Sequence, residues 1–328
     1  MRKLLLAFLL ATSAAAFADE PKIEIVRTSD TSVTFRERLP DRVFIDEAAH
    51  VFHHSGCPQV TKAMPKLAPA AATLRGYKAH CPALRKAEYA TRTVTRKPRD
   101  PKVISVLYLG NSLVYYNEIP AMTREVGARE PRPLRVDAVT RSGVSLEQLW
   151  NDTEALRKLW VEHWDYVLIQ GGGGGVGPTR NAALFNDYLG RFTAAVRKSG
   201  AQPLFYMVWR SESPAAHNAA ALESAKRLNM PVVPVGLAWT DLTSRGRFKR
   251  LDWDGVHQDA FGAYLVACTV YSFIYNKPAH GAPYQFKHLA VKSEVYDDAL
   301  REQNPTPEDA RAIQDAAWKA VQKVKLSG

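Results

Sequence analysis

Apolar runs and amphipathic stretches alternate along the chain from residue 103 onward. Short runs rich in β-branched and apolar residues are typical of strands buried on both faces, and they occupy residues 103–109, 134–139, 166–170, 203–209 and 232–235. Apolar positions at helical spacing occupy 121–128, 146–164, 181–198, 215–228 and 255–275. This alternation predicts an α/β fold with about five parallel strands and helices on both faces of the sheet.

The region before residue 101 has a different pattern. Residues 19–100 consist of short, proline-interrupted segments and contain two of the three cysteines, Cys57 and Cys81. Residues 91–101 are rich in arginine and proline, which is typical of a linker. We therefore expect a small N-terminal Cys/His-containing domain with a basic linker over 19–100. The main domain is expected over 101–328 and ends in a helix.

Residues 1–18 have the pattern of a signal peptide. Two basic residues precede the apolar stretch 4–16, which is too short to span a bilayer, and residues 16–18 (Ala-Phe-Ala) fit the small-x-small cleavage pattern. We expect a secreted or periplasmic protein that starts at Asp19, without a transmembrane segment after cleavage. An uncleaved membrane anchor is the alternative interpretation of the same stretch.

Composition and charge narrow the class of protein. Hydrophobic residues make up 46% of the chain and charged residues 23%, a globular balance, and the mean hydropathy of -0.25 excludes a polytopic membrane protein. Lysine and arginine total 44 against 33 acidic residues, a net charge of +11. This excess favours anionic surfaces or substrates, but no basic run is long enough to indicate a nucleic-acid partner.

The first predicted strand is followed directly by Gly110-Asn111-Ser112. In open parallel sheets the ligand site lies beyond the carboxyl ends of the strands, so a serine on a tight turn there is a candidate nucleophile. The alternative is a turn serine that caps a helix or bonds its own backbone.

The last predicted strand is followed by a second candidate segment, with Asp254 three residues before His257. A serine nucleophile needs a base, and the base needs a group that fixes its tautomer. The alternative is that Asp254 only caps the helix while His257 is exposed. Because both segments follow strands of the same parallel sheet, we expect Ser112, His257 and Asp254 to meet at one rim.

Acyl transfer also needs donors to the developing oxyanion. Gly143 follows the second predicted strand, and Gln170 ends the third and precedes the glycine run 171–175. We expect Ser112, Gly143 and Gln170 to supply the oxyanion hole, and Asn111, Gly171 and Arg210 to lie beside the substrate. An ordinary surface ion pair is the alternative for Arg210.

These segments resemble the conserved blocks of the SGNH/GDSL hydrolases. Gly110-Asn111-Ser112 is similar to the Gly-Asp-Ser block, Gly143 to the glycine of the second block, and Asp254-Gly-Val-His257 to the Asp-x-x-His block. The resemblance covers about residues 103–276. It implies a flavodoxin-like α/β/α sandwich and a serine esterase with Ser112 as nucleophile, His257 as base and Asp254 as its orienting group. It implies no metal or organic cofactor, and an acetyl or short-chain ester as substrate, either a small molecule or a polysaccharide.

One block departs from the pattern. The third block of the family is Gly-x-Asn-Asp, whose Asn donates to the oxyanion, whereas residues 169–173 read Ile-Gln-Gly-Gly-Gly. Gln170 could replace the amide. The departure also leaves open a non-catalytic glycan- or envelope-binding protein on the same fold. The glycine run matches a dinucleotide-binding fingerprint as well, but any poly-glycine stretch does so.

The cysteines and histidines of the N-terminal region have two interpretations. In an exported chain, Cys57 and Cys81 favour a disulfide. Together with the neighbouring histidines they would instead form a metal or partner-binding centre; these are His53, His54 and His80. We expect the disulfide and no bound metal.

Overall fold

The computed structural model describes residues 22–38, 43–54, 57–61, 63–67, 69–80, 89–210, 212–286 and 304–326. The expected signal peptide, residues 1–18, and Cys81 lie outside the described residues. The chain forms two compact units, Met1–Thr95 and Arg96–Gly328.

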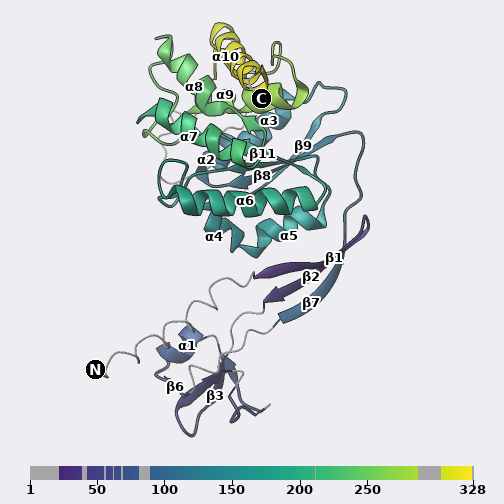
Figure 1. Ribbon diagram of the computed structural model, residues 1–328, viewed down its shortest axis with the longest axis vertical. Helices are drawn as coiled ribbons and strands as arrows, with labels where there is room; N and C mark the ends of the chain where they lie inside the picture. The colour runs from purple at the N-terminus through teal and green to yellow at the C-terminus, as the bar shows by residue number, and fades with distance from the viewer. Residues whose placement is uncertain are drawn as a thin grey trace, which may run out of the picture. The chain divides into compact units, whose positions relative to one another are not determined.

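A five-stranded parallel sheet forms the centre of the larger unit (Figure 1). Its order is β12-β11-β10-β8-β9, so the first strand of the unit lies between the second and the third. This is the flavodoxin-like order, which reverses between β8 and β10 and places a ligand crevice there. The predicted fold class is confirmed. The strands are β8 (Ile104–Gly110), β9 (Leu134–Thr140), β10 (Tyr166–Gln170), β11 (Gln202–Tyr206) and β12 (Val232–Val233).

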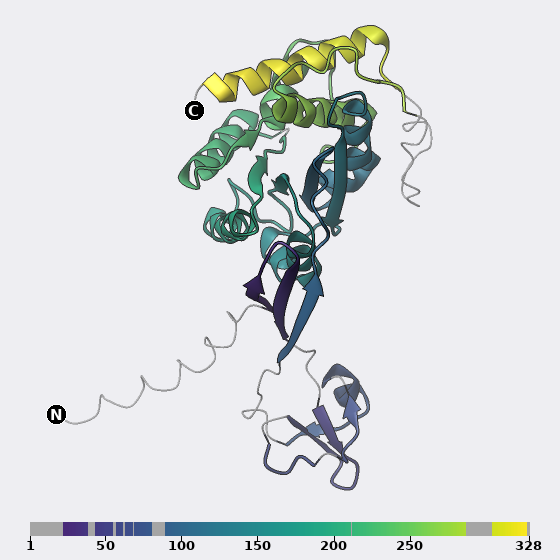
Figure 2. The same ribbon diagram turned by 90° about the vertical axis from the view of Figure 1, so that its right-hand side faces the viewer.

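Helices cover both faces of this sheet. One group packs together on one face: α3 (Ile119–Val126), α8 (Val235–Ser244), α9 (Ala260–Tyr275) and α10 (Pro307–Leu326). Figure 2 shows α10 lying along α9. The other face is covered by α4 (Leu146–Trp150), α5 (Thr153–Val161) and α6 (Ala182–Lys198), while α7 (Pro214–Arg227) contacts α8. No helix in the described part of the chain combines the length and apolar character that a membrane span requires.

Three fully buried tyrosines form hydrogen bonds between neighbouring elements of the larger unit. A buried hydroxyl needs a hydrogen-bond partner, and each tyrosine has one. Tyr108 on β8 donates to Thr123 Oγ1 at 3.0 Å, and the hydroxyl of Tyr264 on α9 accepts from Gln314 on α10. Tyr206 on β11 donates to the carbonyl oxygen of Leu113 at 3.0 Å, which fixes the turn after Ser112 to a central strand.

Local capping explains where the observed helices differ from the predicted ones. The expected helix 146–164 is two helices, because a capping box at Ser145 starts α4 and Asp152 caps α5. The helix expected from residue 255 starts instead at Ala260, where Asp259 accepts a hydrogen bond from the N–H of Gly262. Residues 252–258 are therefore free to form a loop at the rim.

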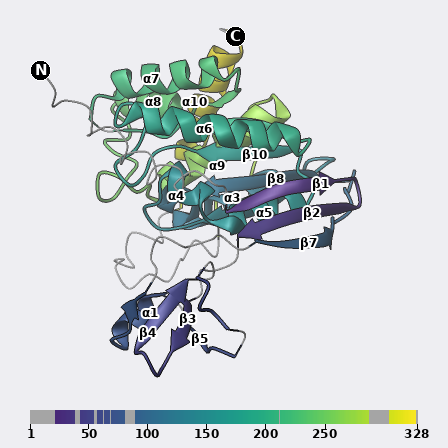
Figure 3. The same ribbon diagram turned by 60° about the horizontal axis from the view of Figure 1, so that its bottom comes forward.

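The smaller unit contains an antiparallel sheet of β1 (Ile23–Thr28), β2 (Ser32–Arg38) and β7 (Tyr89–Thr95) (Figure 3). The expected linker 91–101 is wrong for residues 91–95, which pair along β2. The register pairs Arg38 with Tyr89, the two residues that flank segment 39–88.

That segment forms a second sheet of short strands in the order β5-β3-β4-β6. Its core is small and consists of Val43, Ile45, Phe52 and Ala72. Its elements are β3 (Val43–Asp46), β4 (Val51–His54), β5 (Lys66–Leu67), α1 (Pro69–Leu74) and β6 (Lys78–Ala79).

Candidate active site

The position of Ser112 follows from the end of β8. The strand ends at Gly110, and the short helix α2 (Ser112–Tyr115) starts two residues later. Asn111 is the N-cap, and its Oδ1 accepts a hydrogen bond from the N–H of Leu113 at 3.1 Å. Ser112 is therefore the first residue of a helix at the rim of the sheet, and only 8% of it is exposed.

The structure brings Ser112, His257 and Asp254 together, as the sequence analysis expected. The Nε2 atom of His257 lies 3.0 Å from the Oγ of Ser112, and its Nδ1 lies 2.6 Å from Oδ2 of Asp254. The other carboxylate oxygen of Asp254 accepts hydrogen bonds from the N–H groups of Val256 and His257. Asp254 thus caps its own loop and holds the imidazole ring with separate oxygens.

The protonation pattern of these groups follows from their hydrogen bonds. Burial raises the pKa of Asp254, but the N–H groups of His257 and Val256 and the ring of His257 outweigh burial and leave the pKa below its usual value. The carboxylate is then ionised and can only accept. Nδ1 of His257 must therefore carry a proton, and in the neutral ring Nε2 is then the acceptor for the hydroxyl of Ser112.

A tight loop presents His257 to the serine. The backbones of Asp252 and Gln258 pair as an isolated antiparallel β-bridge. The N–H of Trp253 donates to the carbonyl of His257 at 3.0 Å. The buried carboxylate of Asp252 accepts from the N–H of Gly255 and from Arg250, each at 2.6 Å. Gly255 has a φ of +89°, a conformation that favours glycine.

This loop is tied to the segment that follows Ser112. Gln258 Nε2 donates to the carbonyl of Tyr116 and Asn117 Nδ2 donates to the carbonyl of Gln258, both at 2.8 Å. The ring of Tyr116 lies 4.3 Å from the ring of His257, centroid to centroid. Trp209 Nε1 also donates to the carbonyl of Val256 at 3.1 Å. These positioning residues were not predicted from the sequence, although Tyr116, Asn117 and Gln258 flank the two candidate segments.

Gln170 does not have the role expected for it. Its side chain is buried, and its Oε1 accepts from the N–H of Asn111 at 2.9 Å. Its Nε2 donates to the carbonyls of Gly171 and Gly172, at 3.2 and 2.9 Å. Both amide hydrogens are thus directed to the backbone, and Gln170 cannot donate to an oxyanion in this arrangement. It instead joins the turn after β8 to the glycine run after β10.

Asn111 and Gly171 are buried, and the contacts described for them lie within the protein. Asn111 Nδ2 donates to the carbonyls of Val144 and Gly172, at 3.0 and 2.7 Å, so this amide is used within the protein. Gly171 is buried, and a Cβ there would lie 2.5 Å from the ring of Phe185. Asn111 therefore connects the loops after β8, β9 and β10.

Two backbone N–H groups remain as candidates for an oxyanion hole. The N–H of Ser112 is the first of α2, so the helix itself supplies no acceptor for it. Gly143 has a φ of +63°, and a Cβ there would meet nothing within 4 Å. Glycine is therefore favoured at this position by its backbone conformation, and the open space on this side leaves room for a ligand.

Arg210 lies beside the glycine run. A Cβ on Gly172 would lie 3.7 Å from Nη2 of Arg210, and the guanidinium is partly buried. Burial, followed by the nearby charge of Arg180, lowers the pKa of Arg210. The nearby carboxylate of Glu212 acts in the opposite direction and raises this pKa by a smaller amount.

In the smaller unit, Cys57 is a free, buried thiol. Its Sγ lies 3.3 Å from Nδ1 of His53. The expected disulfide with Cys81 is not present in the structure, and Cys81 itself is outside the described residues. Cys268 is free and fully buried in α9, as expected for a core residue.

The sequence matches no protein-family model and no curated protein. Solved structures do resemble it. A DUF4886 family protein from Bacteroides uniformis shares 18% identity at a TM-score of 0.52, covering 67% of this chain and 95% of its own. A protein from Slackia heliotrinireducens assigned to the SGNH hydrolases shares 23% identity at a TM-score of 0.41, covering 52% and 98%.

The larger unit shares the fold of the solved DUF4886 structure, an α/β/α sandwich around a parallel sheet. A catalytic mutant of an acetylxylan esterase from Geobacillus stearothermophilus is also similar, with 14% identity and a TM-score of 0.41 over 50% of this chain and 90% of its own. In this unit Ser112 follows β8, next to the point where the strand order reverses.

Proposed function

We propose that the chain is an exported serine esterase that hydrolyses acetyl or short-chain acyl esters, with carbohydrate esters as the main class. The observation that carries the proposal is the hydrogen-bonded series Ser112–His257–Asp254 at the rim of the sheet. A helix-capping role for Asp254 would not require its second oxygen to hold the ring of His257.

In the first half of the reaction, Oγ of Ser112 attacks the carbonyl carbon of the ester while Nε2 of His257 takes the hydroxyl proton. Asp254 stabilises the imidazolium that forms. The tetrahedral intermediate collapses as His257 returns the proton to the leaving alcohol, and an acyl group remains on Ser112. In the second half, His257 takes a proton from water, the resulting hydroxide attacks the acyl carbon, and Ser112 is released with its proton restored.

The oxyanion is stabilised by the N–H groups of Ser112 and Gly143. Removal of one donor of this kind costs about 3 kcal/mol of transition-state stabilisation, so two backbone donors are sufficient for substantial catalysis. Because these donors belong to the backbone, the loop connections made by Asn111 and Gln170 are what keep them in place.

The positive charge of the protein and its expected export both bear on the proposed substrate. The half-buried guanidinium of Arg210 beside Gly172 gives the rim a cationic group that can bind sugar hydroxyls or an anionic polymer. The net charge of +11 acts in the same direction. Export follows from the signal-peptide pattern of residues 1–18, which agrees with an extracellular or periplasmic substrate.

Turnover of chromogenic acetyl, butyryl and octanoyl esters tests this function. We expect hydrolysis that is fastest with the acetyl or butyryl ester and absent in Ser112→Ala. The engagement of Gln170 with the backbone favours one alternative, a non-catalytic glycan-binding protein, because it removes the third oxyanion donor. Absence of turnover in folded wild-type protein, together with binding of an acetylated polysaccharide, would support that alternative.

A further inference from the structure

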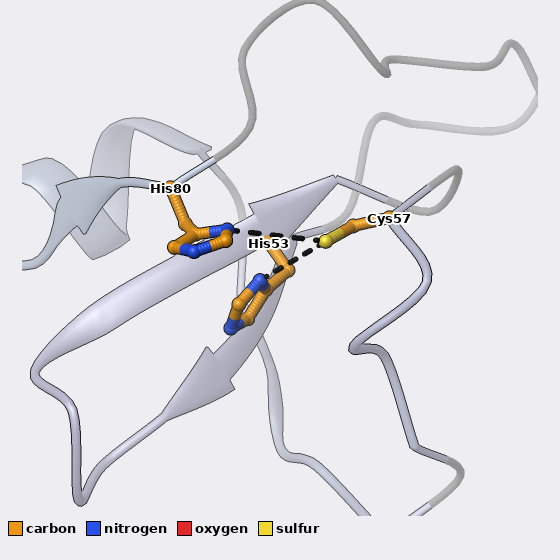
Figure 4. Close-up of side chains that lie close together, drawn as sticks. All are labelled: His53, Cys57 and His80. Atoms are coloured by element: carbon orange, nitrogen blue, oxygen red, sulfur yellow. Dashed lines mark hydrogen bonds between the residues drawn. The ribbon is translucent and has the colours of Figure 1, made fainter.

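Three side chains of metal-binding type converge in the smaller unit (Figure 4). His53 belongs to β4, Cys57 follows that strand, and His80 follows β6. One ligand atom from each lies within 4.8 Å of the other two. Sγ of Cys57 is 3.3 Å from Nδ1 of His53 and 4.0 Å from Nδ1 of His80.

These separations approach those of a tetrahedral zinc site. Zinc lies about 2.3 Å from a thiolate sulfur and about 2.0 Å from an imidazole nitrogen, so the ligand atoms around it are roughly 3.3–3.6 Å apart. Small rotations of the His80 side chain, which is exposed, would close the remaining gap. A thiolate with two imidazoles is a donor set that selects zinc over magnesium or calcium.

The surroundings of His53 support the same interpretation. Its ring is buried, and within the described residues its Nε2 has no hydrogen-bond partner. This atom faces Oδ2 of Asp46 at 3.9 Å. A zinc-bound histidine usually directs its other ring N–H to a carboxylate, which fixes the ring and raises its basicity. Asp46 is placed to do this because β3 and β4 are paired.

The segment also needs additional stabilisation. Among its described residues, the hydrophobic cluster holds four buried residues, and the strands β5 and β6 are only two residues long. Segments this small usually depend on a disulfide or a structural metal. An ion held by His53, Cys57 and His80 would join β4 to the residue that follows β6.

We propose that the smaller unit binds one zinc ion through Nδ1 of His53, the thiolate of Cys57 and Nδ1 of His80. The proposal departs from the expectation of a disulfide without metal. On binding, the Cys57 thiol releases its proton to solvent and a sulfur–zinc bond forms. The fourth position is open to water or a further ligand, and the site is independent of the proposed esterase.

The zinc content of the purified full chain is the first test. We expect about one zinc per chain by inductively coupled plasma mass spectrometry after exhaustive dialysis, and loss of zinc in Cys57→Ser and His80→Ala. Cys268→Ser is the matched control, because that cysteine is buried in α9 and should leave the zinc content unchanged. His80→Ala changes an exposed side chain, so circular dichroism can show that the protein still folds.

Cobalt replacement gives a second readout that does not depend on folding stability. We expect the Co²⁺-loaded chain to show a thiolate-to-cobalt charge-transfer band that is absent in Cys57→Ser. Asp46→Asn keeps the hydrogen bond to the N–H of Ala49 and should weaken zinc binding about tenfold through His53.

Two results would overturn the proposal. One is folded wild-type protein that holds no zinc and does not take it up from solution. The other is a non-reduced intact mass two hydrogens lower than the reduced form, with Cys57 and Cys81 found in one crosslinked peptide.

Discussion

At the scale of single residues, Asn111 shows how the site is held. Its position next to Ser112 suggested contact with substrate, but its side chain caps α2 and binds the carbonyls of Val144 and Gly172. Gln170 acts in the same way from β10. Side-chain amides therefore fix the backbone, and the backbone supplies the proposed oxyanion donors.

The role of Asp254 can be tested by a substitution that preserves shape. In Asp254→Asn the amide can hold the wrong tautomer of His257, so we expect kcat to fall by about 10³–10⁴ while the fold is kept. Asp187→Asn, which changes an exposed carboxylate on α6, is the control and should leave kcat unchanged. Spectrophotometric assays of ester hydrolysis measure kcat for both variants and for the wild type. A loss of less than tenfold in Asp254→Asn would mean that the carboxylate is only a loop cap.

Gln170→Ala separates a structural role from an oxyanion role. The substitution leaves the buried N–H of Asn111 without its partner, so we expect the free energy of unfolding to fall by about 1–3 kcal/mol, with a loss of kcat that follows from the displaced turn. Urea denaturation together with steady-state kinetics measures both. An unchanged unfolding free energy combined with a 10²–10³-fold loss of kcat would instead identify the amide as an oxyanion donor.

At the scale of elements, the site depends on the close approach of three loops. A Cβ on Gly173 would lie 2.2 Å from the carbonyl oxygen of Val144 and 2.3 Å from Nδ2 of Asn111, so the glycine run can reach the neighbouring loop only without a side chain there. Two successive tight pairings, Gly173 with Val176 and Gly177 with Arg180, give the run its conformation. This close approach accounts for the glycine at position 173.

Gly173→Ala should therefore displace the loop from Asn111 and Val144. We expect a loss of kcat of about tenfold or more and a lower melting temperature, as overpacking of this kind typically costs about 1–3 kcal/mol. Gly177→Ala is the matched control, because its Cβ would lie at an ordinary 3.7 Å from Gly172. Equal effects of the two substitutions would contradict the close approach.

The elements that were predictable from the sequence are those with local signals. The five buried strands and the segment after β8 follow from apolar runs and from the rule that parallel strands end at one rim. The antiparallel sheet of the smaller unit was missed, because β2 pairs with β7 across more than fifty residues and no local pattern records that pairing. The backbone contacts of Gln170 and Asn111 were not predicted, for a similar reason. Adjacency in sequence does not show where an amide points.

At the scale of the whole molecule, the larger unit carries a buried histidine that the proposed reaction does not use. His217 on α7 is 4% exposed, and within the described residues neither ring nitrogen has a hydrogen-bond partner. Burial, followed by the charge of Arg210, lowers its pKa from 6.5 to about 4. The folded protein therefore favours the neutral form of the His217 ring.

This lowered pKa predicts a pH dependence of stability. The unfolded chain binds more protons than the folded one between pH 6.5 and 4, so stability is lost as the pH falls through this window. Relative to His217→Leu, which cannot titrate, we expect wild type to lose about 3 kcal/mol between these limits. Urea denaturation at a series of pH values measures the difference. Parallel curves for the two proteins would show that His217 is not held neutral by the fold.

The central claim is that Ser112 is an activated nucleophile. The most direct measurement is the reaction of the purified protein with a fluorophosphonate probe, followed by intact-mass and peptide analysis. We expect one adduct per chain, located on Ser112 and absent in His257→Ala. Absence of an adduct in folded wild-type protein, or an adduct that persists unchanged in His257→Ala, would contradict it.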